Sequence, residues 1–132
     1  MKILVDSNII ISSGMNLFGT PSQALRKVMF EHQLYVSEAT VVELDRFAFK
    51  KVAKKYPESR KFFDRVLSVA TIIPTLNDEN PLELQIRDED DRPILRAAIY
   101  AGVDIILTGD RDFLESGIES PRIMTASEFL DL

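Results

Sequence analysis

Short apolar runs alternate with helix-like stripes along the chain, and this alternation constrains the fold more than any other feature. The runs predicted as strands are, in chain order, residues 2–5, 34–36, 69–73, 104–107 and 122–124. They are apolar throughout rather than alternating in polarity, as is typical of parallel strands covered on both faces. The pattern therefore predicts one α/β sandwich spanning residues 1–132.

Helix-capping residues separate the predicted strands. Pro21 is expected to open a helix that runs through Met29, and Pro57 to open another. Gly102 is expected to end a helix that begins near Asp91, while residues 75–90 are polar and predicted to be irregular. Further predicted segments are a helical turn at 9–12, a helix from Ser37 to Lys55, and a last helix capped by Thr125 and Glu128 and ending at Leu132.

The composition excludes several kinds of chemistry. The 132 residues include no cysteine, which excludes disulfides, thiolate zinc sites and cysteine nucleophiles. The single histidine, His32, excludes a zinc site built on several histidines and reads as a helix-end residue. The apolar run at residues 3–5 is too short for a signal peptide, and no run approaches the length of a membrane span. We therefore expect a cytoplasmic protein without membrane contact.

Four carboxylates fall at positions where a fold of this class gathers its functional groups. Asp6 directly follows the first predicted strand, and Asp110 comes shortly after the fourth. Ligands of open parallel sheets bind beyond the carboxyl ends of strands, where the strand order reverses. Asp91 and Glu43 lie in or near the first turns of helices that can begin at the same edge. We expect these side chains to converge.

Converging carboxylates raise one another's pKa values, and a divalent cation relieves this repulsion. An all-oxygen site suits Mg²⁺ or Mn²⁺. Such an ion can activate water and stabilise charge on a phosphoryl oxygen. Metal-assisted hydrolysis of a phosphodiester bond is the chemistry that best matches the available groups. The net charge of −5 argues against a general polyanion binder, so nucleic acid would need a local basic patch or bound cations.

The motifs around these carboxylates resemble those of the PIN domain family, especially its VapC-like toxin branch. The segments at residues 3–8, 37–44, 90–95 and 108–114 are similar, in order and spacing, to the four acidic motifs of that family. The resemblance covers the chain from Met1 to Leu132.

The resemblance implies a three-layer α/β/α sandwich with a parallel five-stranded sheet in the order 3-2-1-4-5. It also implies a ribonuclease dependent on Mg²⁺ or Mn²⁺, with Asp6, Glu43, Asp91 and Asp110 as the acidic cluster and Asp112 as a lesser fifth member. Members of this family are often homodimeric toxins neutralised by a small antitoxin protein, so both an antitoxin and a homodimer are expected here.

Several of these residues have a second, purely structural interpretation. Glu43 could pair with Thr40 in a capping box, although Ser37 competes for the cap. Asn8 and Thr108 could orient carboxylates or metal-bound waters, or could only stabilise turns.

The acidic run at residues 88–91 leaves the choice of position open. Asp91 could be only an N-cap, and Asp90 could cap or coordinate in its place; Pro93 favours Asp91 by the pattern of the family. Asp110 and Asp112 could be loop residues that only improve solubility.

A basic stretch, residues 46–61, holds seven lysines and arginines against one acid and is interleaved with aromatic residues. A solvated helix face explains this stretch about as well as an RNA-binding patch does. The candidate RNA-binding residues are Lys50, Lys51, Lys54 and Lys55.

Two other classes of function compete with a nuclease. A non-catalytic PIN fold that binds RNA or protein as a scaffold would be signalled by a missing acidic position, and none of the four is missing. Other phosphoryl-transfer domains fit less well. Thr125 stands where a receiver domain has a lysine, Asn8 breaks the Asp-x-Asp of haloacid-dehalogenase-like phosphatases, and no Gly-Lys-Ser/Thr signature of a P-loop occurs.

Overall fold

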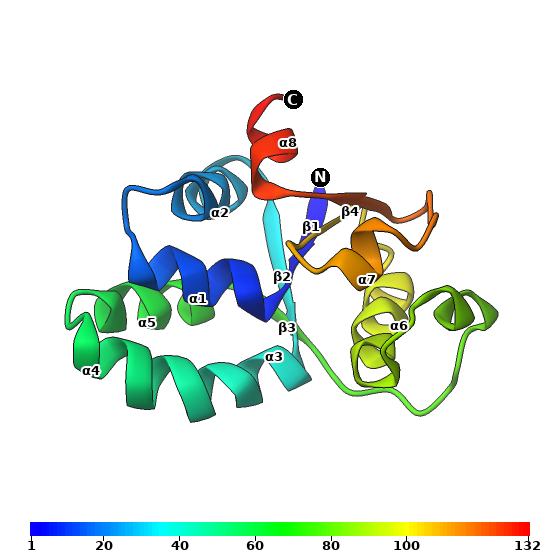
Figure 1. Ribbon diagram of the computed structural model, residues 1–132, viewed down its shortest axis with the longest axis horizontal. Coiled ribbons are helices and arrows are strands. Elements are labelled where there is room, and N and C mark those ends of the chain that lie inside the picture. The colour runs from blue at the N-terminus through cyan, green and yellow to red at the C-terminus, as the bar shows by residue number, and fades with distance from the viewer.

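A computed structural model describes residues 1–132 as a five-stranded parallel sheet with helices on both faces (Figure 1). The strands are β1 Lys2–Val5, β2 Gln33–Ser37, β3 Thr71–Ile73, β4 Ile105–Leu107 and β5 Arg122–Met124. Their order in the sheet is β3-β2-β1-β4-β5. This order and the parallel pairing confirm the sandwich fold that the resemblance implied.

Helices connect every pair of consecutive strands, and the connection between β4 and β5 contains a single short α-helix. The α-helices are α1 Ser7–Met15, α2 Thr20–Glu31, α3 Glu38–Glu43, α4 Ala53–Lys55, α5 Ser59–Val69, α6 Arg92–Ala101, α7 Arg111–Leu114 and α8 Ala126–Leu130. A π-helical segment, η1 Leu44–Val52, joins α3 to α4 into one continuous helix, and two 3₁₀ turns are η2 Pro81–Gln85 and η3 Glu89–Asp91. No helix has both the length and the apolar composition needed to cross a membrane.

The central strand β1 is buried on both faces, which explains its unbroken apolar sequence. Ile3 and Val5 belong to the larger core cluster, which includes residues of α1, α2 and α5. Leu4, between them, belongs to a second cluster with residues of α6. Successive side chains of a strand point to opposite faces, so a strand covered on both sides needs an apolar residue at every position.

Several predicted boundaries were wrong. The strand predicted at residues 69–73 begins at Thr71, because Val69 is the last residue of α5. The predicted turn at residues 9–12 is part of the longer α1. The short helix α7 was not predicted at all, and the last helix ends at Leu130.

The register of the sheet brings the two strand-end aspartates to one place. Val5 pairs with Leu107, so Asp6 and Thr108 follow at the same level of neighbouring strands. The backbone N–H of Asp6 donates to the carbonyl of Leu107 at 3.0 Å and extends the ladder by one residue. The reversal of strand order between β1 and β4 therefore lies directly beneath Asp6 and Asp110.

Candidate active site

Asp6 is held rigidly at the end of β1. Its side chain is buried, and it accepts hydrogen bonds from the backbone N–H of Ser7 at 2.8 Å, the Thr108 hydroxyl at 2.8 Å and the Asn8 amide at 3.1 Å. Burial raises the pKa of Asp6, while the bonds from Thr108 and Ser7 lower it; the nearby charges of Glu43 and Asp110 raise it further. The carboxylate is fixed in orientation and lies in an environment that favours added positive charge.

One buried hydroxyl, that of Thr108, links the two strand-end aspartates. It donates to Asp6 and accepts the backbone N–H of Asp110 at 3.0 Å. The side-chain amide oxygen of Asn8 accepts the backbone N–H of Gly109 at 3.2 Å and completes the link between the ends of β1 and β4. Asn8 and Thr108 therefore do more than stabilise separate turns, because their bonds cross between the two strands.

Glu43 reaches the site through Ser7, a residue that sequence reasoning missed. The Ser7 hydroxyl donates to Glu43 at 2.6 Å, which ties the end of α3 to the beginning of α1. The N-cap of α3 is Ser37, whose hydroxyl accepts the N–H of Thr40. The capping box considered for Thr40 and Glu43 does not form, so the Glu43 carboxylate remains available. The signal for Ser7 was its place between Asp6 and Asn8, in the first turn of α1.

Asp91 lies against Asp110 across the β4 end of the sheet. Burial raises the pKa of Asp91 to about 7, together with hydrogen bonding to Asp110 and the charges of Asp110, Asp88 and Asp6. The Asp91 carboxyl group therefore keeps its proton up to about neutral pH, which is the usual response of a buried acid beside other acids without a cation.

Asp112 and Asp91 belong to a group of three carboxylates that also includes Asp88. One oxygen of each lies within 4.8 Å of the others. Asp88 was overlooked because the acidic run 88–91 offers several equivalent positions. Its side chain accepts the backbone N–H of Asp90 and begins the turn η3, which directs Asp88 toward Asp91. Arg87 donates to Asp112 at 2.8 Å, so Asp112 already has one cationic partner.

Asp90, the alternative to Asp91, faces elsewhere. It is exposed and lines a surface depression with Glu79 and Arg92, away from Asp110. Asp91 is therefore the member of the acidic run whose carboxyl group reaches Asp110.

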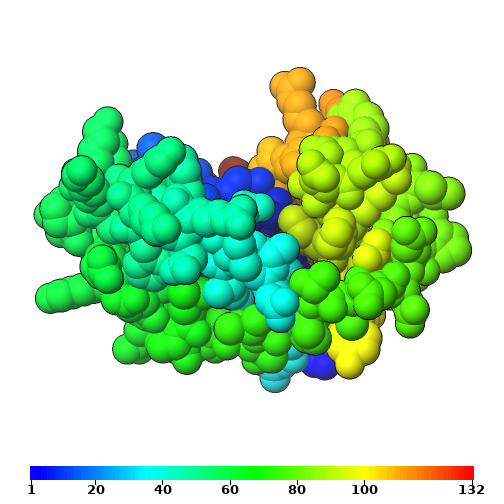
Figure 2. Space-filling view, turned by 90° about the horizontal axis from the view of Figure 1, so that it is seen from below, coloured from blue at the N-terminus to red at the C-terminus, as the bar shows by residue number.

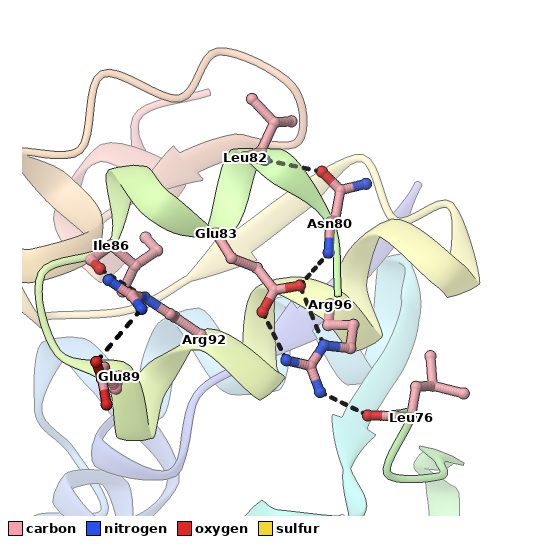
Figure 3. A network of polar contacts seen from close by, with 8 residues as sticks. All are labelled: Leu76, Asn80, Leu82, Glu83, Ile86, Glu89, Arg92 and Arg96. Carbon is pink, nitrogen blue, oxygen red and sulfur yellow. Dashed lines mark hydrogen bonds and ion pairs between the residues drawn. The ribbon is translucent and has the colours of Figure 1, made fainter. Parts of the chain in front are cut away.

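Two arginines of α6, Arg92 and Arg96, hold the segment that carries Asp88 and Asp91 in place by hydrogen bonds and ion pairs (Figure 3). Arg92 donates to the Ile86 carbonyl at 3.0 Å. Arg96 forms a two-pronged ion pair with the buried Glu83, at 2.6 and 3.0 Å, and donates to the Leu76 carbonyl at 2.6 Å. Glu83 also accepts the N–H of Asn80. Part of the segment predicted to be irregular therefore forms the 3₁₀ turns η2 and η3, and the sequence did not reveal that Glu83 in η2 is buried.

The surface above these groups is hollowed between two walls (Figure 2). Figure 2 shows N-terminal residues at the bottom of the hollow, with residues of the α3–η1 helix on one side and residues of η3, α6 and α7 on the other. The lysines Lys50, Lys51, Lys54 and Lys55 lie further along the α3–η1–α4 helix, and all four are exposed. They do not contact the carboxylates but extend from the same wall.

Comparison with known proteins agrees with this arrangement of motifs. The sequence profile of the PIN domain matches residues 2–112. This chain belongs to the PIN domain family. Members of this family are generally nucleases. The uncharacterized protein MJ1680 of Methanocaldococcus jannaschii is 27% identical to this PIN domain over 116 residues, which cover 86% of this chain and 74% of that protein.

Two solved structures share the fold of this PIN domain. VapBC2 from Rickettsia felis, bound to a DNA fragment from their promoter, superimposes with a TM-score of 0.67 at 18% identity and covers 95% of this chain and 98% of that one. PAE2754 from Pyrobaculum aerophilum gives a TM-score of 0.62 at 17% identity, covering 99% and 93%. At these identities the similarity establishes the fold.

The donor set of this PIN domain fits a hard divalent cation. Carboxylate oxygens are the ligands that Mg²⁺ and Mn²⁺ prefer, and here burial, with a further contribution from neighbouring carboxylates, raises the pKa values of Asp6 and Asp91. Asp6, Asp91 and Asp110 form one side of this acidic cluster, while Asp88 and Asp112 extend it toward α7. A cation among them would relieve the repulsion that now favours protonation.

Proposed function

We propose that this PIN domain is a metal-dependent endoribonuclease that hydrolyses phosphodiester bonds of RNA. The observation that supports this function is the pair Asp91 and Asp110: burial, together with the hydrogen bond and charge of Asp110, raises the pKa of Asp91 to about 7 at the edge where Asp6 is also held. Crowded acids of this kind are a signature of functional sites.

The ion, Mg²⁺ or Mn²⁺, would be held by Asp6, Asp91, Asp110 and Asp112. When bound, it supplies positive charge that stabilises the phosphoryl oxygens and makes water a better nucleophile. Asp6 contributes a carboxylate of fixed orientation, because the bonds from Asn8 and Thr108 hold it in place. Asn8 and Thr108 thus have supporting roles.

Glu43 is proposed to take up the proton that the attacking water releases. It lies on the opposite wall from Asp91 and is exposed, with only the Ser7 hydroxyl as a partner. During hydrolysis the water oxygen forms a new bond to phosphorus, the bond to the leaving oxygen breaks, and that oxygen acquires a proton. A positioned carboxylate contributes to such steps by general base catalysis.

The direct test is cleavage of a mixed set of labelled RNAs in Mg²⁺ or Mn²⁺, with and without EDTA. We expect cleavage only with the metal, and loss of about 10²-fold or more for Asp6→Asn and Asp110→Asn. Asparagine can replace aspartate at both N-cap positions, so these variants should fold. Asp64→Asn on the exposed surface of α5 is the matched control and should cleave normally.

The result that would refute the nuclease is a protein that neither cleaves RNA nor binds Mg²⁺ or Mn²⁺ in titration calorimetry. That outcome would favour the non-catalytic scaffold, which binds RNA or protein without using the carboxylates.

The basic helix is proposed to hold phosphates of the RNA. Lys50, Lys51, Lys54 and Lys55 are exposed on the wall that begins at Glu43. Replacing the four with glutamate should weaken RNA binding and flatten its dependence on salt concentration, because fewer counterions are released. Unchanged affinity and an unchanged salt slope would contradict this role.

We further propose that the chain is the toxin of a VapC-like toxin–antitoxin pair, that it works in the cytoplasm as a homodimer, and that a small antitoxin protein neutralises it. The shared fold of the VapBC2 structure supports this proposal. Growth arrest on expression of the intact chain, absent for Asp6→Asn, would support a toxin. Light scattering that gives the mass of a monomer at micromolar concentration would refute the homodimer.

A further inference from the structure

An exposed aromatic ring lies one helical turn beyond Glu43. Glu43, Phe47 and Lys51 follow one another at intervals of four residues along the α3–η1 helix. Leu44 and Ala48, each one position later, are fully buried, so the stripe of Glu43, Phe47 and Lys51 lies beside the buried face and borders solvent. The Lys51 ammonium group is 5.5 Å from the centroid of the Phe47 ring, which confirms that the two side chains are neighbours.

Phe47 contributes little to the hydrophobic core. It remains 43% exposed and belongs to neither core cluster, whereas Phe49, two residues later, packs against the larger cluster. The Phe49 ring lies 5.7 Å from the buried ring of Phe63, while Phe47 pairs with no aromatic ring. Folding therefore does not account for a phenylalanine at position 47.

The charge around Phe47 fits a nucleic-acid strand. Phe47 lies near the start of the basic stretch 46–61, which carries seven lysines and arginines against one acid. On the opposite wall of the hollow acids outnumber arginines, and Arg87 and Arg92 are paired with Glu115 and Glu89, so that wall offers phosphates fewer free cations than the helix does. A strand that reaches the carboxylates is therefore directed along the helix wall, past Phe47 and Lys51.

We propose that Phe47 stacks on a base of single-stranded RNA next to the scissile bond, and that Lys51 binds the adjoining phosphate. Exposed aromatic rings beside lysines are the usual means of holding single strands, because every base offers a face for stacking. The proposed ribonuclease function is the basis for the identity of this ligand. A protein partner on the same ring is the competing occupant, which the experiment below separates.

The test compares binding of a 5′-fluorescein-labelled 12-nucleotide single-stranded RNA pool by the intact chain in an Asp110→Asn background, which prevents cleavage. We expect Phe47→Leu to weaken binding about 10-fold, whereas Phe47→Tyr stays within about twofold of the parent. Phe30→Leu is the matched control, since Phe30 is 77% exposed on α2 and should bind RNA normally. Lys51→Gln should reduce the slope of the salt dependence by about one.

A second measurement detects base stacking directly. A matched oligonucleotide carrying 2-aminopurine should lose fluorescence on binding to the parent and to Phe47→Tyr, and lose less with Phe47→Leu. Thermal melting of each variant checks that the fold is intact.

Three outcomes would overturn the proposal in distinguishable ways. If Phe47→Leu binds and quenches like the parent, Phe47 does not stack on RNA and its exposed ring is assigned to a protein contact, while the nuclease proposal stands. If Phe47→Tyr weakens binding as much as Phe47→Leu, an aromatic face is not what the RNA uses. If the wild-type chain neither binds nor cleaves RNA, the ribonuclease function fails and the stacking role fails with it.

Discussion

At the scale of single residues, the site depends on a few hydrogen bonds that cross between strands. The buried hydroxyl of Thr108 donates to Asp6 and accepts from the backbone of Asp110, so one side chain sets the spacing of two carboxylates. Ser7 likewise links Asp6 to Glu43 on the opposite wall, because its backbone N–H donates to Asp6 and its hydroxyl donates to Glu43. Groups fixed in this way need little rearrangement when charge arrives, which favours tight and specific ligand binding.

Asp91 should make the metal-free protein less stable as the pH rises. Its pKa is raised from 3.8 to about 7 in the folded state, so the folded chain binds more protons than the unfolded chain between these values. The stability that Asp91 contributes is therefore fully present below about pH 4 and is lost as the pH rises through about 7. Thermal melting in EDTA from pH 5 to pH 8 measures this loss.

The control for the pH experiment is Asp91→Asn, which removes the titrating group. We expect its melting temperature to fall less steeply with pH than that of the wild type, so that the variant gains relative stability toward pH 8. Parallel curves for the two proteins would show that Asp91 does not carry the raised pKa.

Gly14 in α1 should not tolerate a side chain. A Cβ atom at this position would lie 2.1 Å from the Cζ atom of Phe63, whose ring is fully buried in the core. We expect Gly14→Ala to destabilise the protein by about 1–3 kcal/mol, because overpacking outweighs the better helix propensity of alanine. Urea unfolding gives the free energy, with Ser12→Ala on the exposed face of α1 as the control. A stability equal to that of the wild type would mean that the Phe63 ring moves aside readily.

At the scale of elements, the site is assembled from parts of the chain that are held by their own local contacts. α1 begins at Asp6 and α7 at Asp110, and both acids accept backbone N–H groups as N-caps. Both residues therefore begin a helix just beyond the end of a strand and face the cleft. The segment with η2 and η3 is different, because its position depends on the ion pair between Glu83 of η2 and Arg96 of α6.

Breaking the ion pair between Glu83 and Arg96 should lower the stability of the protein. Glu83→Gln leaves Arg96, whose side chain is 15% exposed, without its ionic partner, and we expect a loss of about 3 kcal/mol. Because the hydrogen bond from Arg96 lowers the pKa of Glu83, the stability from this pair is present above the unfolded pKa and is lost as the pH falls. Urea unfolding at pH 7 measures the loss; Glu79→Gln, exposed in the same segment, should unfold like the wild type.

At the scale of the whole molecule, charge is divided between the two walls of one cleft. The net charge is −5, yet the α3–η1–α4 helix is basic and the η3–α7 side is acidic. The local basic patch that a nucleic acid would need, given the negative net charge, therefore lies on the α3–η1–α4 side. What matters is the local charge next to the carboxylates, which the folded arrangement determines.

A divalent cation should stabilise the folded protein as a whole. At a Mg²⁺ or Mn²⁺ concentration about 100 times the Kd, the expected gain is about 2.7 kcal/mol, seen as a higher melting temperature. The gain should be larger at pH 8 than at pH 6, because the cation competes with the proton on Asp91. Asp91→Asn should lose most of it and Asp64→Asn should keep it. Equal gains in both variants would place the cation elsewhere.

The sequence by itself determined the architecture and the approximate place of the chemistry. The apolar runs around Ile3 and Ile106 are typical of strands covered on both faces; Asp6 directly follows the first run, and Asp110 comes shortly after the second. Caps such as Ser37, Gly102 and Thr125 were also readable, because each acts on backbone groups within a few residues. These features are local, so the order of residues is enough to define them.

Only the tertiary structure decided which polar groups meet. The bonds of Ser7 to Glu43 and of Thr108 to Asp6 join residues 36 and 102 positions apart, and no local pattern specifies them. Within the acidic run, Asp88 and Asp91 face the site while Asp90 faces away. This arrangement follows from the turn η3 and from the bonds that Arg92 and Arg96 of α6 form with the preceding segment. Burial of Glu83 has the same origin. Hydrogen bonds and charge interactions act over a few ångströms in space, and separation along the chain does not encode that distance.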